Sequence, residues 1–255
     1  MVMKKVNIGI IGLGTIGSGV YKILNERRAR IKKLYGIDIK IVRCCDISES
    51  SKRKLKISNS QFTKDFRVIT RDKNVDVVIE LIGGTKVAYK ISEDAIKNGK
   101  NLITANKALL AERGKDIDKL LSKTGKNINH EASVGGGIPI IGTIRDSILI
   151  NNILSFQGIM NGTCNYVLSL MSRKIEFQDA IKAAQKAGFA ETDSTLDING
   201  KDTAHKVVVL CKTCFGLDVK LKDMFIEGIE NITSYDLDCS EKLGYKIKLL
   251  GIGRI

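Results

Sequence analysis

Apolar runs and helical spacings alternate along the first half of the chain. Runs rich in β-branched residues occur at 6–11, 37–45, 75–82, 101–105 and 127–132, and helical spacing follows at about 15–35, 87–98 and 107–123. Strands and helices in turn are typical of a parallel sheet covered by helices on both faces. The pattern therefore predicts an α/β domain with a doubly wound parallel sheet.

The pattern changes after residue 132. The segment SVGGGIPII, residues 133–141, holds a glycine run and Pro139, the only proline of the chain, and such a cluster favours a domain boundary. Beyond it, one strand near 153–160 and helices near 163–172, 177–187 and 201–215 are indicated. We therefore predict two domains, residues 1–133 and residues 134–255, of which the second is an α+β unit.

The composition is that of a soluble globular protein. Of the 255 residues 43% are hydrophobic and 27% are charged. No apolar run approaches the roughly 18 residues of a membrane span, and the N-terminus lacks the apolar core of a signal peptide. These features predict a cytoplasmic protein with no membrane partner. The cysteines show no spacing typical of a zinc site or a disulfide scaffold, and Cys211 and Cys214 fall within a predicted helix, so we expect reduced thiols.

The formal net charge is +14, but the basic residues are scattered along the chain. There is no tryptophan, and only seven phenylalanines and six tyrosines are available to stack on bases. Nucleic acid is therefore not the expected partner. A ligand that carries phosphate groups would profit from the same positive field.

Three glycines follow the first apolar run in GxGxxG spacing. Gly12 suits a tight turn, Gly14 lets the backbone approach a diphosphate, and Gly17 allows a helix to pack closely on a strand. The diphosphate would lie on the amides that open the helix, at the positive end of its dipole. The motif predicts a Rossmann dinucleotide-binding domain in which Thr15 and Ile16 also border the nucleotide.

Asp46 ends the second predicted strand, where an acid commonly binds a ribose hydroxyl. It lies further from Gly17 than the roughly 20 residues usual for this motif, and an ordinary solvated loop acid is the alternative explanation. Lys52, Arg53 and Lys54 follow closely and could instead receive a 2'-phosphate. The sequence therefore leaves the choice between NAD and NADP open.

Two further segments fall at the carboxyl ends of predicted strands, the edge at which such sheets bind ligands. Gly83 and Gly84 follow the strand at 75–82, and Lys107 follows the strand at 101–105. A lysine that opens a helix lies at the unfavourable end of the helix dipole. We therefore expect Gly83 to border the nucleotide and Lys107 to have a functional role.

This basic chain concentrates acid between residues 191 and 206, ETDSTLDINGKDTAHK. Asp202 and Lys206 are four residues apart on a predicted helix and so share one face. An exposed ion pair is the simpler explanation of such spacing. However, Lys206 abuts an apolar run, and Glu191 and Asp197 add carboxylates beyond what a turn needs, which favours a site for a small zwitterion. The helix also carries an apolar stripe that should face the core: Ala204, Val207, Val208, Cys211 and Phe215.

Together these segments resemble the homoserine dehydrogenase family. The similarity runs through GIIGLGTIG, VVIELIGG, TANKALLA, HEASVGGGIPII, GIMNGTCNYVL and AAQKAGFAETDSTLDINGKDTAHK, which cover most of the chain. The resemblance implies reversible oxidation of L-homoserine to L-aspartate 4-semialdehyde by hydride transfer to NAD or NADP. This reaction is a step toward threonine, methionine and isoleucine, and the resemblance also implies a homodimer.

The resemblance also implies roles for individual residues. Lys206 corresponds to the catalytic lysine, Asp202 works beside it, and Lys107 corresponds to a second lysine at the substrate oxygen. The expected substrate-binding residues are Glu191, Asp197, Gly162 and Thr163. The segment EASVGGGIP is similar to one that holds a monovalent cation, with expected ligands at Glu131, Val134, Gly136 and Ile138.

Members of this family usually extend beyond the point that corresponds to Ile255, so we expect the second domain to be truncated at its C-terminal side. Two alternatives stay open on the sequence alone. One is another Rossmann amino-acid dehydrogenase, because the fold does not fix the substrate. The other is a non-catalytic protein that senses a cofactor or binds nucleic acid.

Overall fold

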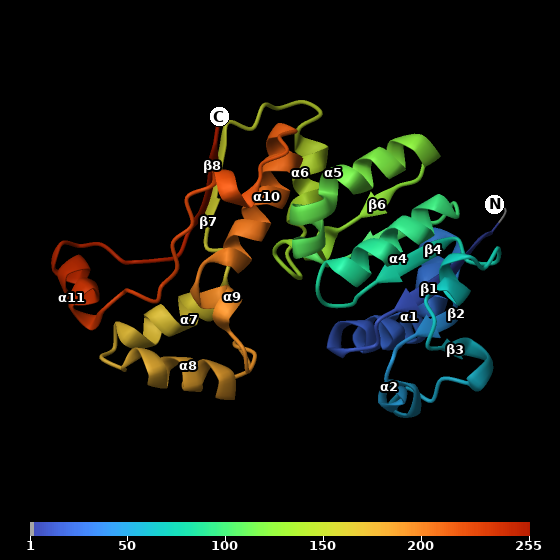
Figure 1. Cartoon of the computed structure of the whole chain (residues 1–255), viewed down its shortest axis with the longest axis horizontal. Coiled ribbons are helices and arrows are strands. Elements are labelled where there is room, and N and C mark those ends of the chain that lie inside the picture. The colour runs from blue at the N-terminus through green and yellow to red at the C-terminus, as the bar shows by residue number, and fades with distance from the viewer. Residues whose placement is uncertain (1–2) are drawn as a thin grey trace. The chain divides into compact units, whose positions relative to one another are not determined.

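The chain forms two compact units, Met1–Ser133 and Val134–Ile255, each with its own apolar core. The structure is a computed structural model that describes residues 3–255, and Figure 1 labels its helices and strands. Within that range no helix is both long and apolar enough to cross a membrane.

The first unit is built on a six-stranded parallel sheet with the order β3-β2-β1-β4-β5-β6. Its strands are β1 (Lys4–Ile11), β2 (Ile37–Cys45), β3 (Phe62–Thr63), β4 (Val77–Glu80), β5 (Asn101–Thr104) and β6 (Ile128–Asn129). The chain winds outward from β1 in one direction and from β4 in the other, so the strand order reverses between β1 and β4. This arrangement confirms the predicted doubly wound sheet.

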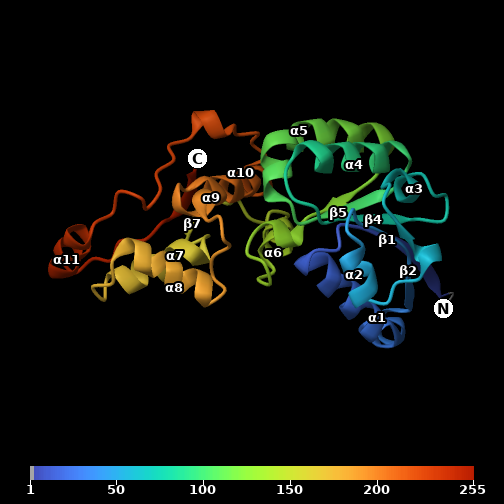
Figure 2. The same ribbon diagram turned by 60° about the horizontal axis from the view of Figure 1, so that its bottom comes forward.

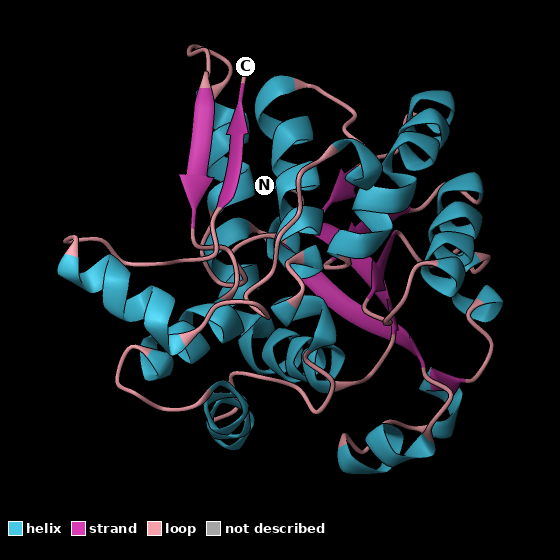
Figure 3. Ribbon diagram, turned by 60° about the vertical axis from the view of Figure 1, so that its left-hand side comes forward, coloured by secondary structure: helices cyan, strands magenta, loops and turns pink. Residues whose placement is uncertain are grey.

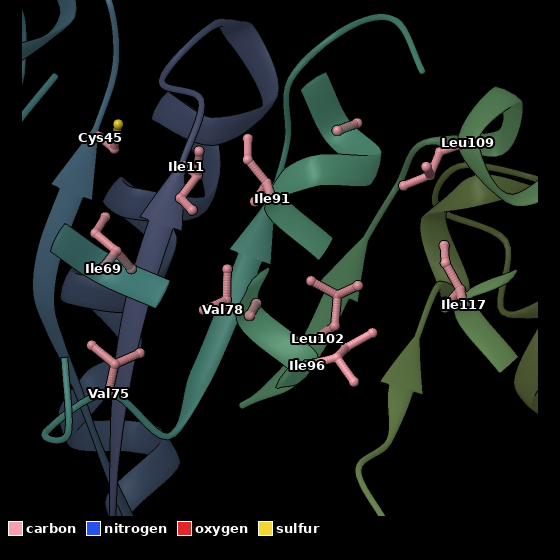
Figure 4. Packing of buried hydrophobic residues seen from close by; sticks show 12 residues of the cluster. Ile11, Cys45, Ile69, Val75, Val78, Ile91, Ile96, Leu102, Leu109 and Ile117 are labelled. Carbon is pink, nitrogen blue, oxygen red and sulfur yellow. The ribbon is translucent and has the colours of Figure 1, made fainter. Parts of the chain in front are cut away.

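Helices cover both faces of this sheet. They are α1 (Thr15–Tyr35), α2 (Glu49–Lys54), α3 (Arg67–Thr70), α4 (Lys86–Lys97) and α5 (Lys107–Thr124). Figure 2 shows α4 and α5 on one face and α1 on the other. Ile91 of α4 and Ile117 of α5 pack with Leu102 of β5 in one buried cluster (Figure 4). Ile11 of β1 belongs to the same cluster. Because successive strand residues point to opposite faces, its neighbour Ile10 belongs to a second cluster, which packs against α1.

The second unit combines α-helices with one antiparallel strand pair, β7 (Ser155–Gly158) and β8 (Gly251–Arg254) (Figure 3). Its helices are α6 (Ile140–Ser147), α7 (Gly162–Met171), α8 (Phe177–Lys186), α9 (Thr195–Ile198), α10 (Lys201–Phe215) and α11 (Ser234–Lys242). Val167 and Leu168 of α7 pack against Ala180 and Ala184 of α8 in its core. This α+β composition agrees with the sequence expectation.

Three sequence expectations were wrong in detail. The strand expected at 127–132 is limited to β6, because the chain then turns into a 3₁₀ helix at Glu131–Ser133, where Ser133 N donates to His130 O at 2.9 Å. The strand expected at 153–160 is limited to β7, because β8 pairs with only those four residues.

The third correction concerns α10, which is buried on nearly all sides instead of along one stripe. α6, α9 and β8 all pack against it. Between positions 202 and 211 only Lys206 retains partial exposure, while Phe215 is half-buried and stacks on Phe156 with ring centroids 5.6 Å apart. A lysine therefore interrupts an otherwise buried helix surface.

Candidate active site

The turn from β1 into the first turn of α1 requires glycine at two positions and leaves open space at a third. Gly12 has a φ of +95°, and a Cβ there would lie 2.5 Å from Leu81 O. A Cβ on Gly17 would lie 1.9 Å from Gly12 O. A Cβ on Gly14, by contrast, would meet no atom within 4 Å. Gly12 and Gly17 thus serve the turn and the packing, and Gly14 borders open space at the start of the helix.

Backbone and side-chain hydrogen bonds hold this loop. Gly12 N donates to Cys45 O at 2.9 Å, and Leu13 N donates to the Asp46 carboxylate at 2.6 Å. The hydroxyls of Ser18 and Ser51 donate to Leu13 O at 2.7 and 2.8 Å. Hydrogen bonds therefore hold both the amide nitrogen and the carbonyl oxygen of Leu13.

Asp46 has a structural task that sequence reasoning missed. One of its oxygens accepts from Leu13 N, and the other accepts from Ser48 N at 2.8 Å. Each carboxylate oxygen has a further acceptor site, so a ribose hydroxyl can still bind there. Of the basic residues nearby, Lys52 lies with its ammonium 5.1 Å from the ring centre of Phe62, and Arg53 and Lys54 are exposed.

These residues fit a dinucleotide. The first-turn amides of α1 lack intrahelical acceptors, as at any helix start, and the first turn, which includes Thr15 and Ile16, contains no acidic residue to repel a diphosphate. Ile16 is 60% exposed, so this end of the helix is accessible within its unit. The open side of Gly14 gives the diphosphate room to approach.

A buried carboxylate ties together the ends of β4 and β5. Glu80 accepts from Ile82 N at 2.7 Å and from the Thr104 hydroxyl at 2.6 Å. Burial raises the pKa of Glu80, and these two hydrogen bonds oppose part of that rise. Sequence reasoning missed Glu80, although an acidic residue within an apolar strand-like run is a signal for a buried carboxylate.

Asn106 connects the two loops at the same edge. Its side chain caps α5 by accepting from Leu109 N at 3.0 Å, and it donates to Gly84 O at 2.7 Å. The backbone of exposed Gly83 and the half-buried first residue of α5, Lys107, are thereby held at the carboxyl edge of the sheet.

In the second unit, Lys206 forms an ion pair that is largely buried. Its ammonium donates to Asp202 Oδ2 at 2.7 Å and to Met160 O at 2.5 Å. The two side chains are 16% and 8% exposed. Asp202 lies in the first turn of α10, where a negative charge is favoured by the helix dipole. The explanation of this spacing as an exposed surface pair therefore does not hold.

Asn161 joins this ion pair to a second carboxylate. Its amide nitrogen donates to Asp202 Oδ2 at 2.8 Å and to Asp197 Oδ1 at 2.7 Å, and its oxygen accepts from Cys164 N at 2.8 Å. The Cys164 thiol donates to Asp197 O at 3.1 Å. Burial, together with the charges of Asp197 and Asp202, raises the pKa of this thiol to about 12. Sequence reasoning missed Asn161, although an asparagine just before a helix is a capping signal.

The other expected substrate residues lie around this group. Gly162 is exposed at the first position of α7, and the hydroxyl of buried Thr163 donates to Phe189 O at 2.5 Å. Glu191 is exposed in the turn before α9. Within residues 3–255 no hydrogen bond links its carboxylate to Asp197, Asp202 or Lys206.

The residues expected to hold a cation belong to consecutive turns. Glu131 is half-buried in the 3₁₀ turn of the first unit, whereas buried Val134, Gly136 with a φ of +59° and exposed Ile138 belong to the second unit. Among the described residues no group of three or more His, Cys, Asp or Glu side chains is arranged to hold a metal ion.

Comparison with known protein families matches both units. The model of the homoserine dehydrogenase NAD-binding domain matches residues 12–131, and the homoserine dehydrogenase model matches residues 139–254. The structure is similar to that of a homoserine dehydrogenase from Thiobacillus denitrificans, with a TM-score of 0.93 and 39% identity over 99% of this chain and 58% of the other. For the S. aureus homoserine dehydrogenase at pH 7.5 the TM-score is 0.83 and the identity 40%, over 99% and 60%.

Curated relatives give the same result. The chain is 44% identical to a homoserine dehydrogenase of Neisseria gonorrhoeae over 99% of its own length but 58% of the relative, so it spans about three-fifths of that protein. It is 37% identical to a homoserine dehydrogenase of Methanocaldococcus jannaschii over 96% of its own length and 80% of the relative. With matches to both domain models and this extent of identity, the chain belongs to the homoserine dehydrogenase family.

Proposed function

We propose that this chain catalyses the reversible oxidation of L-homoserine to L-aspartate 4-semialdehyde with NAD or NADP. The observation that carries the proposal is the buried ion pair of Lys206 and Asp202, which is held in place by Met160 O and Asn161. Family membership supports the choice of substrate, and the glycine loop of the first unit supports the choice of cofactor.

In this proposal the first unit binds the nucleotide. The first-turn amides of α1 hold the diphosphate beside Gly14, and Asp46 accepts a ribose hydroxyl. Gly83 borders the nucleotide at the carboxyl edge of the sheet, and Lys107 lies at the same edge, where it acts on the substrate oxygen. When bound, the nicotinamide ring supplies the group that accepts or donates the hydride.

Lys206 moves the proton of the reacting oxygen. An ammonium has three N–H donors, and in the described part of the chain two of them are committed to Asp202 and Met160 O. The third is left for the substrate oxygen. In the oxidation direction the neutral amine form of Lys206 takes up the hydroxyl proton as this third N–H while the hydride leaves carbon for the nicotinamide, and in the reduction direction the ammonium returns that proton and stabilises the developing alkoxide.

The surrounding carboxylates select the substrate. Glu191 and Asp197 bind the ammonium of homoserine, and Gly162 and Thr163 contact the rest of the amino acid. Asp202 keeps Lys206 oriented and compensates its charge in a largely buried place, where an unpaired ammonium would be costly.

We further propose a cation site, a cellular location, a homodimer and small-molecule partners. The backbone around Glu131, Val134, Gly136 and Ile138 holds a monovalent cation. The protein works in the cytoplasm, in the synthesis of threonine, methionine and isoleucine. It acts as a homodimer, which the exposed apolar side chains on and beside the β7–β8 pair support: Leu154, Ile252 and Ile255. Its partners are small molecules, and neither nucleic acid nor membrane is among them.

The proposal is tested by the initial rate of nicotinamide reduction with L-homoserine, measured with NAD and with NADP. The matched comparison is 4-hydroxybutanoate, which has the same alcohol and carboxylate but no ammonium group. We expect turnover of homoserine with one or both cofactors and far slower turnover of the comparison compound. Equal rates for both compounds would contradict recognition of the ammonium by the carboxylates.

A further inference from the structure

The orientation of the Asn161 side chain is fixed by its three partners. Cys164 N can only donate, so it must face the amide oxygen, and the ionised carboxylates of Asp197 and Asp202 can only accept, so they must face the amide nitrogen. The reversed amide would place oxygen against two carboxylates and would lose all three hydrogen bonds. The side chain is 3% exposed, so water cannot readily replace these partners.

The two N–H groups of this amide serve two carboxylates from different elements. Asp197 lies on α9 and Asp202 in the first turn of α10. Their oxygens lie within 2.8 Å of the same nitrogen, close enough for the two negative charges to repel each other in a poorly solvated place. The amide offsets that repulsion and fixes the separation of the carboxylates.

Asn161 also fixes the position of Lys206 indirectly. Oxygen Oδ2 of Asp202 accepts from both Asn161 and Lys206, so the amide limits the rotation of the carboxylate that orients the ammonium. The preceding residue, Met160, supplies the carbonyl that accepts a second Lys206 proton. One dipeptide thus contacts the ion pair on both sides.

We infer that Asn161 is a positioning residue for the reaction: its amide bridges Asp197 and Asp202 and so holds the Lys206 ammonium in the geometry that proton transfer requires. This inference rests on the proposed function and adds to it a residue that acts through the carboxylates. Capping of α7 by the amide oxygen is its second, separable task.

Two substitutions separate these tasks. Asn161→Asp and Asn161→Ser both keep an oxygen that can cap a helix, and Asp and Ser cap about as well as Asn. Neither can donate to both carboxylates. Thr233→Asn is the matched control, because it exchanges the capping residue of α11, which lies outside the proposed site.

We expect Asn161→Ser to fold, with a lowered thermal midpoint because the repulsion between Asp197 and Asp202 is no longer offset, while kcat for homoserine, measured well below that midpoint, falls about 10- to 100-fold, the effect of losing a hydrogen bond to a charged group. The KM for the nucleotide should stay within about twofold, because the nucleotide loop belongs to the other unit. Asn161→Asp should lose at least as much kcat, because it adds a third carboxylate. A folded Asn161→Ser variant that retains the wild-type kcat would overturn the inference, even if Asn161→Asp proves unstable.

A readout without turnover keeps the test independent of the proposed function. In a ¹H–¹⁵N spectrum of the wild-type chain, we expect both side-chain amide protons of Asn161 to be protected from solvent exchange. Asp197→Asn and Asp202→Asn should each shift a different one of the two. If the wild-type chain does not oxidise homoserine but these shifts are seen, the proposed function fails and the bridge stands. If both protons exchange at the rate of a solvated amide, the bridge itself is wrong.

Discussion

The ammonium of Lys206 lies 2.7 Å from Oδ2 of Asp202, one helical turn away on α10, and both side chains are largely shielded from water. The pair of Lys182 and Asp179, by contrast, is far more exposed, at 73% and 66%. A shielded pair contributes differently from a surface pair, because removal of one partner leaves an uncompensated charge.

The first prediction concerns this difference. Asp202→Ala should lower the free energy of unfolding by about 3 kcal/mol, because Lys206 then loses its counter-charge in a largely buried place. Asp179→Ala should hardly change it, because that pair is exposed and screened by solvent. Urea unfolding of both variants measures the difference. Equal stabilities of the two variants would show that Lys206 is better solvated than its 16% exposure indicates.

The glycines of the nucleotide loop give a second prediction. Gly17→Ala should destabilise the chain by about 2 kcal/mol or more, because the new Cβ meets Gly12 O at 1.9 Å. Gly14→Ala should leave stability nearly unchanged, since no atom lies within 4 Å of its Cβ, yet weaken NAD or NADP binding about tenfold or more by filling the space that a diphosphate needs.

Gly19→Ala is the matched control for that experiment. It also has no atom within 4 Å of the new Cβ, and it lies inside α1, where alanine stabilises a helix by up to about 1 kcal/mol over glycine. Nucleotide affinity, measured by calorimetry, should not change. If Gly14→Ala binds the nucleotide as tightly as Gly19→Ala, the diphosphate does not lie against Gly14.

The third prediction concerns Glu80 and pH. Because burial raises the pKa of Glu80, the folded state binds its proton more tightly than the unfolded state does. This contribution to stability is fully present below the ordinary glutamate pKa of about 4.3 and is lost as the pH rises through the raised pKa. Glu80→Gln has no such proton, so its stability relative to wild type should increase from pH 4 to pH 7.

Glu49→Gln provides a control of opposite sign. Lys64 lowers the pKa of Glu49, so this carboxylate contributes stability above its ordinary pKa and loses it as the pH falls. Glu49→Gln should therefore become slightly less stable relative to wild type as the pH rises, and the change should be small because the pair is exposed. A parallel response of the two variants would contradict the burial argument for Glu80.

The sequence was informative wherever local pattern decides structure. Apolar runs with intervening helices predicted the parallel sheet, and GxGxxG predicted which glycine meets backbone and which faces open space. Gly17 is constrained locally, by Gly12 O, and Gly12 needs its positive φ for the turn, although the atom that a Gly12 Cβ would meet first, Leu81 O, comes from the end of β4.

Features decided by distant contacts could not be read in this way. Asn161 meets Asp197 and Asp202 only because α7, α9 and α10 pack together, and these residues are 36 and 41 positions apart. The helical period of α10 predicted one buried stripe, but contacts from α6, α9 and β8 bury the other sides as well.

The most direct test of this account is the rate of homoserine-dependent nicotinamide reduction by the wild-type chain and by Lys206→Ala, with Lys182→Ala as the control on an exposed ion pair of the same unit. We predict that Lys206→Ala lowers kcat by about 10²- to 10⁴-fold, as expected for loss of a proton-transferring group, with unchanged nucleotide affinity and a wild-type rate for Lys182→Ala. An active wild-type chain whose Lys206→Ala variant keeps its rate would contradict the role given to this lysine.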